Sequence, residues 1–374
     1  MKATDIAGAV ARVEGATCQR VLVALEGLEL PGENAFGERV TVERGADVPA
    51  LVRRMARAAA EGERVGLIAR AEDLAGARAD LARLAAGGLG VVVHALTEPA
   101  APGSVESGVA SALSLDDLPW GMLVGSGTAD AIDLALVARR AAEDSGCPFF
   151  VVHERPPASR LEPPGVALTR ELVEAFLGGP RSSRPAQPAT SERAFAERAP
   201  FALASSMRGL EALSTRRHDV IERAPGKDCG LGLVGIGALG DALLADVERQ
   251  RAAGHDVAAV RVVAWRPFPG PRLVKALHRA LAITVLEAVD RPLAGSGPLA
   301  LHLKASFADA LTWAPDYPGI GRIPRIVSGA VAAGRELDAT DLDAVVDNLL
   351  ADERGKRSFV LDGPPGAGLR AAVR

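Results

Sequence analysis

The chain has few cysteines, and they do not cluster. Cys18, Cys147 and Cys229 lie far apart, and no Cys-x-x-Cys pair occurs. This spacing supports neither a disulfide framework nor an iron–sulfur or zinc cluster. The six histidines also show no metal-ligand spacing with one another or with a cysteine. The sequence therefore predicts no metal site held by this chain alone, and it is typical of a protein of the reducing cytoplasm.

The chain also lacks a surplus of positive charge and any long apolar run. Its 43 basic and 47 acidic residues give a net charge of −4, which offers little attraction to a nucleic-acid backbone. No apolar run approaches the ~20 residues that span a bilayer. Asp5, Arg12 and Glu14 interrupt the amino-terminal segment, which is unlike a signal peptide. We therefore expect no nucleic-acid partner, no secretion and no membrane insertion.

Aromatic residues are scarce, at 3% of the chain, whereas 48% of residues are hydrophobic. Cores built from Ala, Val and Leu suit helices layered on parallel strands. The length of 374 residues allows two or three domains of about 150 residues each.

Short β-branched segments alternate with Ala/Arg/Glu-rich segments of helical spacing, which predicts an α/β fold. The expected strands are 20–25, 39–43, 64–69, 89–96, 148–154, 230–237, 256–268, 282–288 and 324–329. A Pro-, Gly- and Ser-rich stretch near 178–195 reads as a linker. We therefore predict two open, mostly parallel sheet domains. Their expected boundaries are 1–178 for the first domain, 179–227 for a linker and helical bridge, 228–350 for the second domain and 351–374 for a loosely ordered tail.

The motif Gly235-x-Gly237-x-x-Gly240 follows an expected strand and precedes an expected helix. This is the context of a dinucleotide fingerprint. The next strand would then end in an acidic residue that holds the ribose, but it ends in Trp265-Arg266-Pro267. We therefore interpret the glycines as a tight turn with close helix packing.

Several motifs further along resemble the second domain of pyruvate:ferredoxin oxidoreductases. In that family one strand ends in Arg-Pro-Phe, as at 266–268. The next ends in Asp-Arg, followed by a Gly-rich loop and Pro-Leu; Asp290, Arg291, Gly295, Gly297, Pro298 and Leu299 reproduce this order. Residues 323–349 resemble the closing strand, a weakened glycine turn and a helix. Residues 109–153 resemble a helix–strand unit of the first domain.

The resemblance implies a thiamine-diphosphate-binding-like pyrimidine domain followed by a transketolase-C-terminal-like domain. It also implies oxidative decarboxylation of a 2-oxoacid such as pyruvate, with thiamine diphosphate as the electron sink. In the family, a glutamate of the first domain hydrogen-bonds the cofactor's aminopyrimidine ring. The segment Val40–Val52 resembles the strand-Glu-x-Gly-Ala-helix unit that carries it, which makes Glu43 the catalytic and cofactor-binding candidate. The alternative is that Glu43 only caps a helix or faces water.

Other family positions are changed in this chain. The segment that carries a substrate-binding Arg just beyond a His reads His94-Ala95-Leu96-Thr97-Glu98. An Arg would clamp the substrate carboxylate, whereas Glu98 would repel it. The family's early Tyr-Pro-x-Thr-Pro loop is missing, and only Pro31 and a glycine turn remain.

The resemblance also implies partner chains. The Gly-Asp-Gly signature, followed later by Asn-Asn, that binds Mg²⁺ and diphosphate does not occur. We therefore expect a hetero-oligomer in which this chain is an alpha-type subunit. A beta subunit would hold Mg²⁺ and the diphosphate, and an iron–sulfur subunit would pass electrons to ferredoxin or flavodoxin. The alternative is a degenerate, non-catalytic paralogue that serves assembly.

Overall fold

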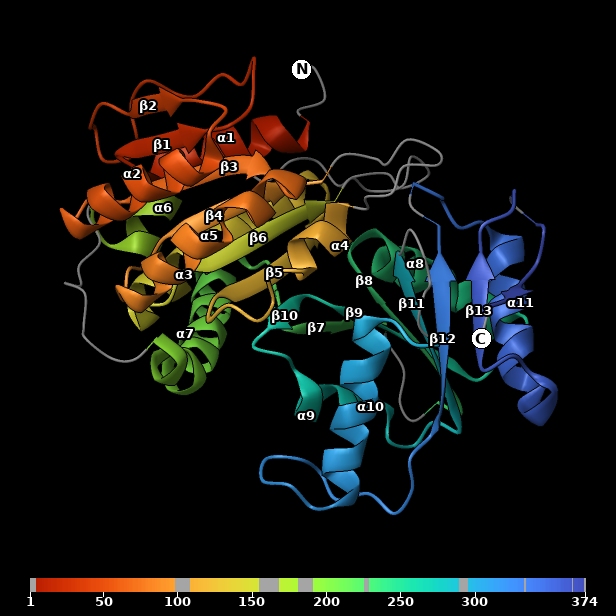
Figure 1. The fold of residues 1–374 in the computed structure, drawn as a ribbon. Coiled ribbons are helices and arrows are strands. Elements are labelled where there is room, and N and C mark those ends of the chain that lie inside the picture. The colour runs from red at the N-terminus through yellow and green to blue at the C-terminus, as the bar shows by residue number, and fades with distance from the viewer. Residues whose placement is uncertain are drawn as a thin grey trace. The chain divides into compact units, whose positions relative to one another are not determined.

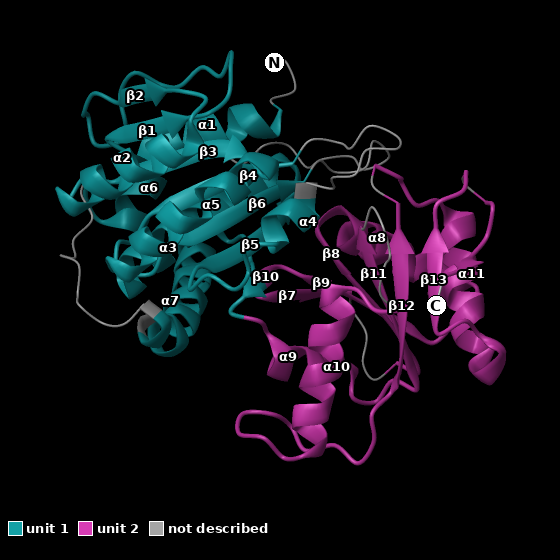
Figure 2. Ribbon diagram, in the orientation of Figure 1, with its two compact units in different colours: residues 1–98, 108–219, 265–267 teal, residues 99–107, 220–264, 268–374 magenta. Residues whose placement is uncertain are grey.

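The computed structural model describes residues 5–97, 108–154, 168–180, 191–224, 229–288, 295–332, 334–364 and 366–372. These residues form two compact units (Figures 1 and 2). The first unit holds the described residues up to Asp219 together with Trp265–Pro267. The second holds the described residues of Val220–Ala264 and those from Phe268 onward.

The first unit is built on a seven-stranded sheet of order β10-β5-β6-β4-β3-β1-β2. Its strands are β1 (Arg20–Val23), β2 (Thr41–Arg44), β3 (Val65–Arg70), β4 (Val92–Leu96), β5 (Gly121–Ser126), β6 (Phe149–Glu154) and β10 (Ala264–Arg266). The strands from β5 to β2 in this order pair in parallel. Their carboxyl ends therefore share one edge, where open α/β sheets bind ligands.

Two groups of helices accompany this sheet. They comprise α1 (Ile6–Thr17), α2 (Val48–Ala60), the 3₁₀-helix η1 (Glu72–Ala77), α3 (Arg78–Ala86), α4 (Gly108–Leu113), α5 (Gly127–Ser145), α6 (Arg170–Leu177) and α7 (Ser191–Ser214). Helix α1 packs against α5 and α6, whereas α2 packs against η1 and α3. Local signals fix the helix ends. Asp47 caps α2 by accepting from Ala50 N, and α5 ends at Gly146, whose φ of 69° suits glycine.

The second unit has a seven-stranded sheet of order β14-β13-β12-β11-β8-β9-β7. Its strands are β7 (Ile221–Arg223), β8 (Leu231–Ile236), β9 (Val257–Val262), β11 (Ala282–Ala288), β12 (Arg325–Val331), β13 (Ser358–Leu361) and β14 (Arg370–Ala371). The helices are α8 (Gly237–Ala252), α9 (Gly270–Leu277), α10 (Pro298–Leu311), α11 (Ala339–Leu350) and the 3₁₀-helix η2 (Asp352–Arg354). The edge strands β7 and β14 are antiparallel, and the other pairs are parallel.

The cores are aliphatic, as the composition predicts. Strands β4, β5, β8 and β9 are buried along their whole length. One hydrophobic cluster in the core of the second unit consists mainly of Leu, Val and Ala and includes Phe359. Over the described residues, no helix has both the length and the apolar composition needed to cross a membrane.

The structure differs from three local predictions. The expected strand 256–268 breaks at Val263, so that β9 lies in the second sheet and β10 in the first. The expected helical bridge contains α7, which packs in the first unit because Ala199, Leu203 and Leu210 form a buried apolar stripe. The expected tail contributes β13 and β14, and Phe359 is buried in the second core.

Candidate functional site

Glu43 lies on β2, the edge strand of the first sheet, opposite Leu22 of β1. Its carboxylate accepts hydrogen bonds from two arginines. Arg20 Nη1 donates to Oε1, and Arg54 Nη1 donates to Oε2 at 3.3 Å. Arg20 also binds Glu63 at 2.7 Å. With 24% of its side chain exposed, Glu43 belongs to a surface group of ion pairs and remains accessible from solvent.

The chain around Glu43 has the strand–turn–helix structure that the sequence predicts. Strand β2 ends at Arg44, and Gly45 N donates to Val23 O at 3.1 Å as the last bond between this segment and β1. Asp47 then caps α2. Glu43 is the next-to-last residue of β2, and its carboxylate lies between Arg20, at the start of β1, and Arg54 of α2.

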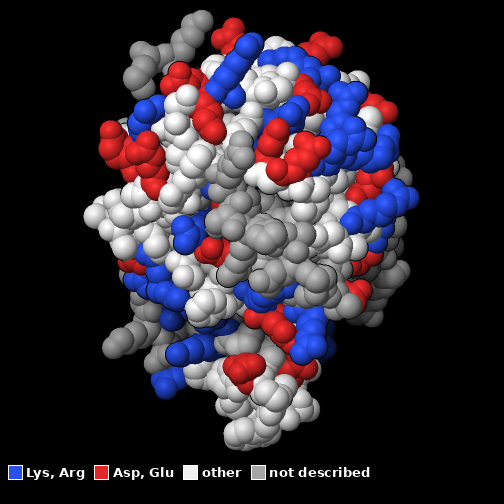
Figure 3. All heavy atoms as spheres, turned by 90° about the vertical axis from the view of Figure 1, so that its left-hand side faces the viewer, with Lys and Arg blue, Asp and Glu red and all other residues white. Residues whose placement is uncertain are grey.

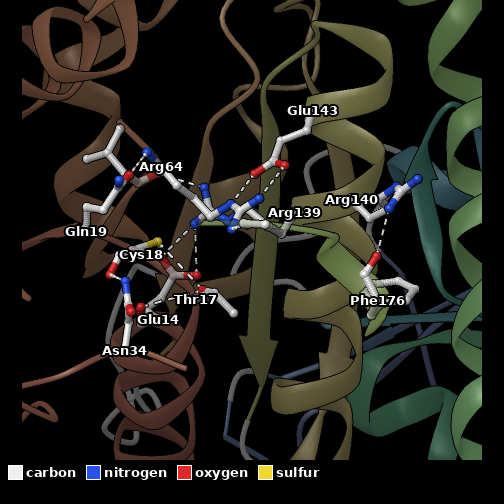
Figure 4. A network of polar contacts seen from close by, with 12 residues as sticks. Glu14, Thr17, Cys18, Gln19, Asn34, Arg64, Arg139, Arg140, Glu143 and Phe176 are labelled. Carbon is white, nitrogen blue, oxygen red and sulfur yellow. Dashed lines mark hydrogen bonds and ion pairs between the residues drawn. The ribbon is translucent and has the colours of Figure 1, made fainter. Parts of the chain in front are cut away.

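A buried network of ion pairs joins α1 to α5 (Figure 4). Arg139 Nη2 donates to both oxygens of Glu14, at 3.0 and 2.7 Å, and both side chains are 1% exposed. Gly66 of β3 makes room for this pair, because a Cβ there would lie 1.6 Å from Glu14 Oε2. Burial by itself would raise the pKa of Glu14, but the charge of Arg139 and the contact with His94 outweigh it and lower the pKa to about 2.

A second buried pair extends this network. Arg64 donates to both oxygens of Glu143 at 2.5 and 2.9 Å, and to Gly179 O at 2.6 Å. The Gln19 side chain accepts from the Arg64 backbone N–H at 2.7 Å (Figure 4). The two arginines and two glutamates balance in charge, which is what buried ions require. The network therefore fixes α1, α5 and the start of β3 to one another.

Two buried histidines continue from Glu14 toward the carboxyl edge of the sheet. His94 Nε2 lies 2.9 Å from Glu14 Oε1, and His94 Nδ1 lies 2.8 Å from His153 Nε2. The two rings are stacked, with centroids 5.1 Å apart. Burial, with the charge of His94, holds the pKa of His153 well below its usual value. One of the two nitrogens, His94 Nδ1 or His153 Nε2, donates to the other, and the tautomers of the two rings decide which.

Sequence reasoning missed this Glu14–His94–His153 chain and its arginine. Glu14 and Arg139 are 125 positions apart, so no local spacing links them. The available signal was a charged residue on each of two otherwise apolar helix stripes, "VARVEGAT" and "DLALVARR". Charged residues at buried helix positions are normally paired.

The glycine turn of the second unit serves close packing. A Cβ on Gly235 would lie 2.8 Å from Gly240 N, and a Cβ on Gly240 would lie 2.6 Å from Arg261 Cγ. Arg261 is itself paired with Asp241 of α8 at 3.0 Å. These contacts agree with the interpretation of the motif as a tight turn that lets α8 approach β8 and β9.

The Gly-Pro-Leu segment docks α10 onto β11. Glu287, which is 5% exposed, accepts from Leu299 N at 2.6 Å and from Ala300 N at 3.2 Å, at the start of α10. A Cβ on Gly297 would lie 2.3 Å from Glu287 Oε2, so glycine permits this approach. Burial raises the pKa of Glu287. The carboxylate acts as a tertiary cap for the first turn of the helix.

Several residues that the sequence analysis singled out have no described position. Glu98, Asp290 and Arg291 lie outside the described residues. Within the described part of the chain, no group of three or more His, Cys, Asp or Glu side chains is arranged to hold a metal ion. Cys18, Cys147 and Cys229 are buried, and none of them forms a disulfide within the described residues. Basic and acidic side chains are interspersed over much of the face shown in Figure 3.

The chain was compared with protein-family models, with curated proteins and with solved structures. No protein-family model matches the chain. Pyruvate synthase subunit PorA of Pyrococcus furiosus is 25% identical over 196 residues, which cover 47% of this chain and 50% of PorA. The chain therefore spans about half the length of the curated relative that it matches.

Two solved structures share the fold. One is the 2-oxoglutarate:ferredoxin oxidoreductase from Magnetococcus marinus, determined with 2-oxoglutarate, coenzyme A and succinyl-CoA bound. It matches with a TM-score of 0.58 and 13% identity, over 92% of this chain and 64% of that chain. A split-gene transketolase, an inactive beta4 tetramer, matches with a TM-score of 0.53 and 14% identity, over 89% of this chain and 91% of that chain.

These matches confirm the predicted fold class of two open, mostly parallel α/β sheet domains. They also confirm the resemblance that the sequence motifs indicate, because the chain is similar to a pyruvate synthase subunit over about half of its length and shares its fold with a 2-oxoglutarate:ferredoxin oxidoreductase.

Proposed function

We propose that this chain is an alpha-type subunit of a thiamine-diphosphate-dependent 2-oxoacid oxidoreductase. It would supply the pyrimidine-facing side of a cofactor site shared with a partner chain. The observation that carries the proposal is the position of Glu43, an accessible carboxylate at the carboxyl end of β2, just before the turn into α2. The similarity to PorA supports the same assignment.

The residues around Glu43 are compatible with this role. Each carboxylate oxygen has two lone pairs, and each accepts one arginine hydrogen bond. One acceptor position per oxygen is therefore left for a ring nitrogen of the aminopyrimidine. When bound, thiamine diphosphate supplies the electron sink for decarboxylation. Glu43 would hold the proton that the aminopyrimidine must exchange, and Arg20 and Arg54 would orient the carboxylate.

The rest of the site would come from other chains. A beta subunit would hold Mg²⁺ and the diphosphate, because the sequence of this chain lacks the motif for them. An iron–sulfur subunit would receive the electrons. The substrate would be a small 2-oxoacid such as pyruvate. Glu98 in place of the family's arginine would repel the substrate carboxylate, so either the register of this segment or the substrate has changed.

Purification of the native complex tests this proposal. We expect a co-purifying chain that carries Gly-Asp-Gly, and reduction of a viologen dye that depends on a 2-oxoacid and on thiamine diphosphate. Glu43→Ala should lower that rate by orders of magnitude and leave assembly intact, as expected for loss of a proton-transfer group. Glu63→Ala is the matched control, because Glu63 also pairs with Arg20 and is similarly exposed, at 28%.

One observation favours a second candidate function, a non-catalytic assembly subunit. Arg20 and Arg54 occupy both oxygens of Glu43, so the carboxylate is satisfied without any cofactor. In that case a complex would form, but Glu43→Ala and Glu63→Ala would behave alike in every assay of its activity.

A further inference from the structure

A surface hollow of about 590 Å³ lies in the second unit, away from the residues discussed so far. His278 and Arg279 line it just after α9, and Gly319, Ile320, Gly321 and Arg322 line it before β12. Its volume falls within the range of roughly 300–1,000 Å³ typical of small-molecule sites. Two of the six lining residues are arginines, one is a histidine and none is acidic, so the composition of the hollow favours an anion.

The basic residues suit phosphate. The side chains of Arg279 and Arg322 are exposed, and a guanidinium binds phosphate oxygens through paired N–H donors. A Cβ on Gly321 would meet nothing within 4 Å, which leaves open space beside Arg322. The acidic residues of the neighbouring segment, Asp309 and Asp316, are not among the lining residues.

Trp313 supplies an aromatic surface beside the hollow. Helix α10 ends in a Schellman motif, in which Trp313 N donates to Ala310 O at 3.3 Å and Ala314 N donates to Asp309 O at 2.9 Å. Trp313 occupies the left-handed position, with φ 59°, where glycine is usual and a bulky residue is strained. Its ring packs on Gly319, where a Cβ would lie 2.3 Å from Cζ3. Nevertheless 75% of Trp313 is exposed.

We propose that this hollow binds a phosphate-bearing aromatic ligand of the nucleotide type. The phosphates would contact Arg279 and Arg322, and the base would stack on the exposed face of Trp313. This site lies within the second unit and uses no residue of the proposed cofactor site. The inference therefore goes beyond the proposed function and does not depend on Glu43.

Tryptophan fluorescence gives a direct test on the full chain. Trp120 and Trp265 are each 1% exposed, so a ligand at the surface should change chiefly the emission of Trp313. We expect ADP to quench it saturably, adenosine to bind more weakly, and pyrophosphate to compete with ADP. The double variant R279Q/R322Q should bind ADP at least tenfold more weakly. Lys275→Gln is the matched control, because Lys275 is an exposed cation of α9 outside the hollow.

The variant Trp313→Gly tests the contribution of the tryptophan ring to ADP binding without destabilising the fold. Glycine relieves the left-handed backbone at this position, so the variant should remain folded by circular dichroism. Calorimetry should show ADP binding several-fold weaker than in the wild type. Absence of saturable binding at millimolar ADP, or equal ADP affinity in R279Q/R322Q, would overturn the proposal. Binding of hexaglutamate where ADP does not bind would also overturn it and identify a docking surface for an acidic protein segment.

Discussion

Arg139 of α5 and Glu14 of α1 form an ion pair with a shortest N–O distance of 2.7 Å, although 125 positions separate them in the sequence. Neither side chain is more than 1% exposed. The pair links α1 to α5, the helix that ends at the predicted cap Gly146. Arg139 Nη1 also donates to Val65 O at 2.7 Å, so the pair holds the start of β3 against these helices.

Removal of one partner should be costly. Arg139→Met leaves the Glu14 carboxylate buried without its cation, and breaking a buried pair in this way costs about 3–5 kcal/mol. Urea unfolding measures this loss. Arg53→Gln is the control, because it breaks an ion pair whose arginine is 57% exposed, and it should change the midpoint little. Equal midpoints for the two variants would contradict the structural role of the network.

The pH dependence of stability should report the same carboxylate. The pKa of Glu14 falls from 4.5 to about 2 on folding, so the ionised form stabilises the fold above pH 4.5. This contribution, about 3 kcal/mol by linkage, is lost as the pH falls from 4.5 to 2. The difference in free energy of unfolding between the wild type and Glu14→Gln should therefore shrink over that window. A constant difference down to pH 2 would contradict the lowered pKa.

Gly66 should tolerate no side chain while Glu14 is present. The added methyl group of Gly66→Ala would overlap Glu14 Oε2, and overpacking costs about 1–3 kcal/mol. The double variant Gly66→Ala/Glu14→Ala should lose less stability than the sum of its single variants. Gly76→Ala, where a Cβ meets nothing within 4 Å, is the control and should be near neutral. Strict additivity in the cycle would contradict the contact.

His153 should stay neutral well below pH 6.5. Burial and the charge of His94 lower its pKa, and its Nε2 lies 2.8 Å from His94 Nδ1 inside the protein. Nitrogen NMR of the full chain measures the protonation of this ring. We expect a neutral imidazole with no titration near pH 6.5. Titration at the usual pH would contradict the lowered pKa.

Local sequence signals predicted the sheets and several of their boundaries. Parallel strands appeared as short β-branched runs, and Gly146 ends α5 where the sequence placed a cap. The strand–Glu–turn–helix unit around Glu43 also matches the prediction. These features depend on hydrophobic periodicity and turn chemistry, which nearby residues determine.

Features that depend on distant residues could not be predicted in the same way. The break at Val263 sends the next three residues to the first sheet as β10, although the sequence reads as one continuous strand. The Glu14–Arg139 pair and the histidines beside it also join segments that are far apart. The burial of these side chains depends on tertiary packing, which the local secondary-structure propensity of the sequence does not predict.

We propose that Glu43 exchanges a proton with a thiamine diphosphate cofactor in a complex with partner chains. The most direct test compares Glu43→Ala with Glu63→Ala in the purified native complex, by measuring 2-oxoacid-dependent dye reduction at saturating thiamine diphosphate. The account predicts that Glu43→Ala loses orders of magnitude in rate with assembly intact, while Glu63→Ala retains most of the activity. Equal activity of the two variants would contradict it and favour the non-catalytic assembly subunit.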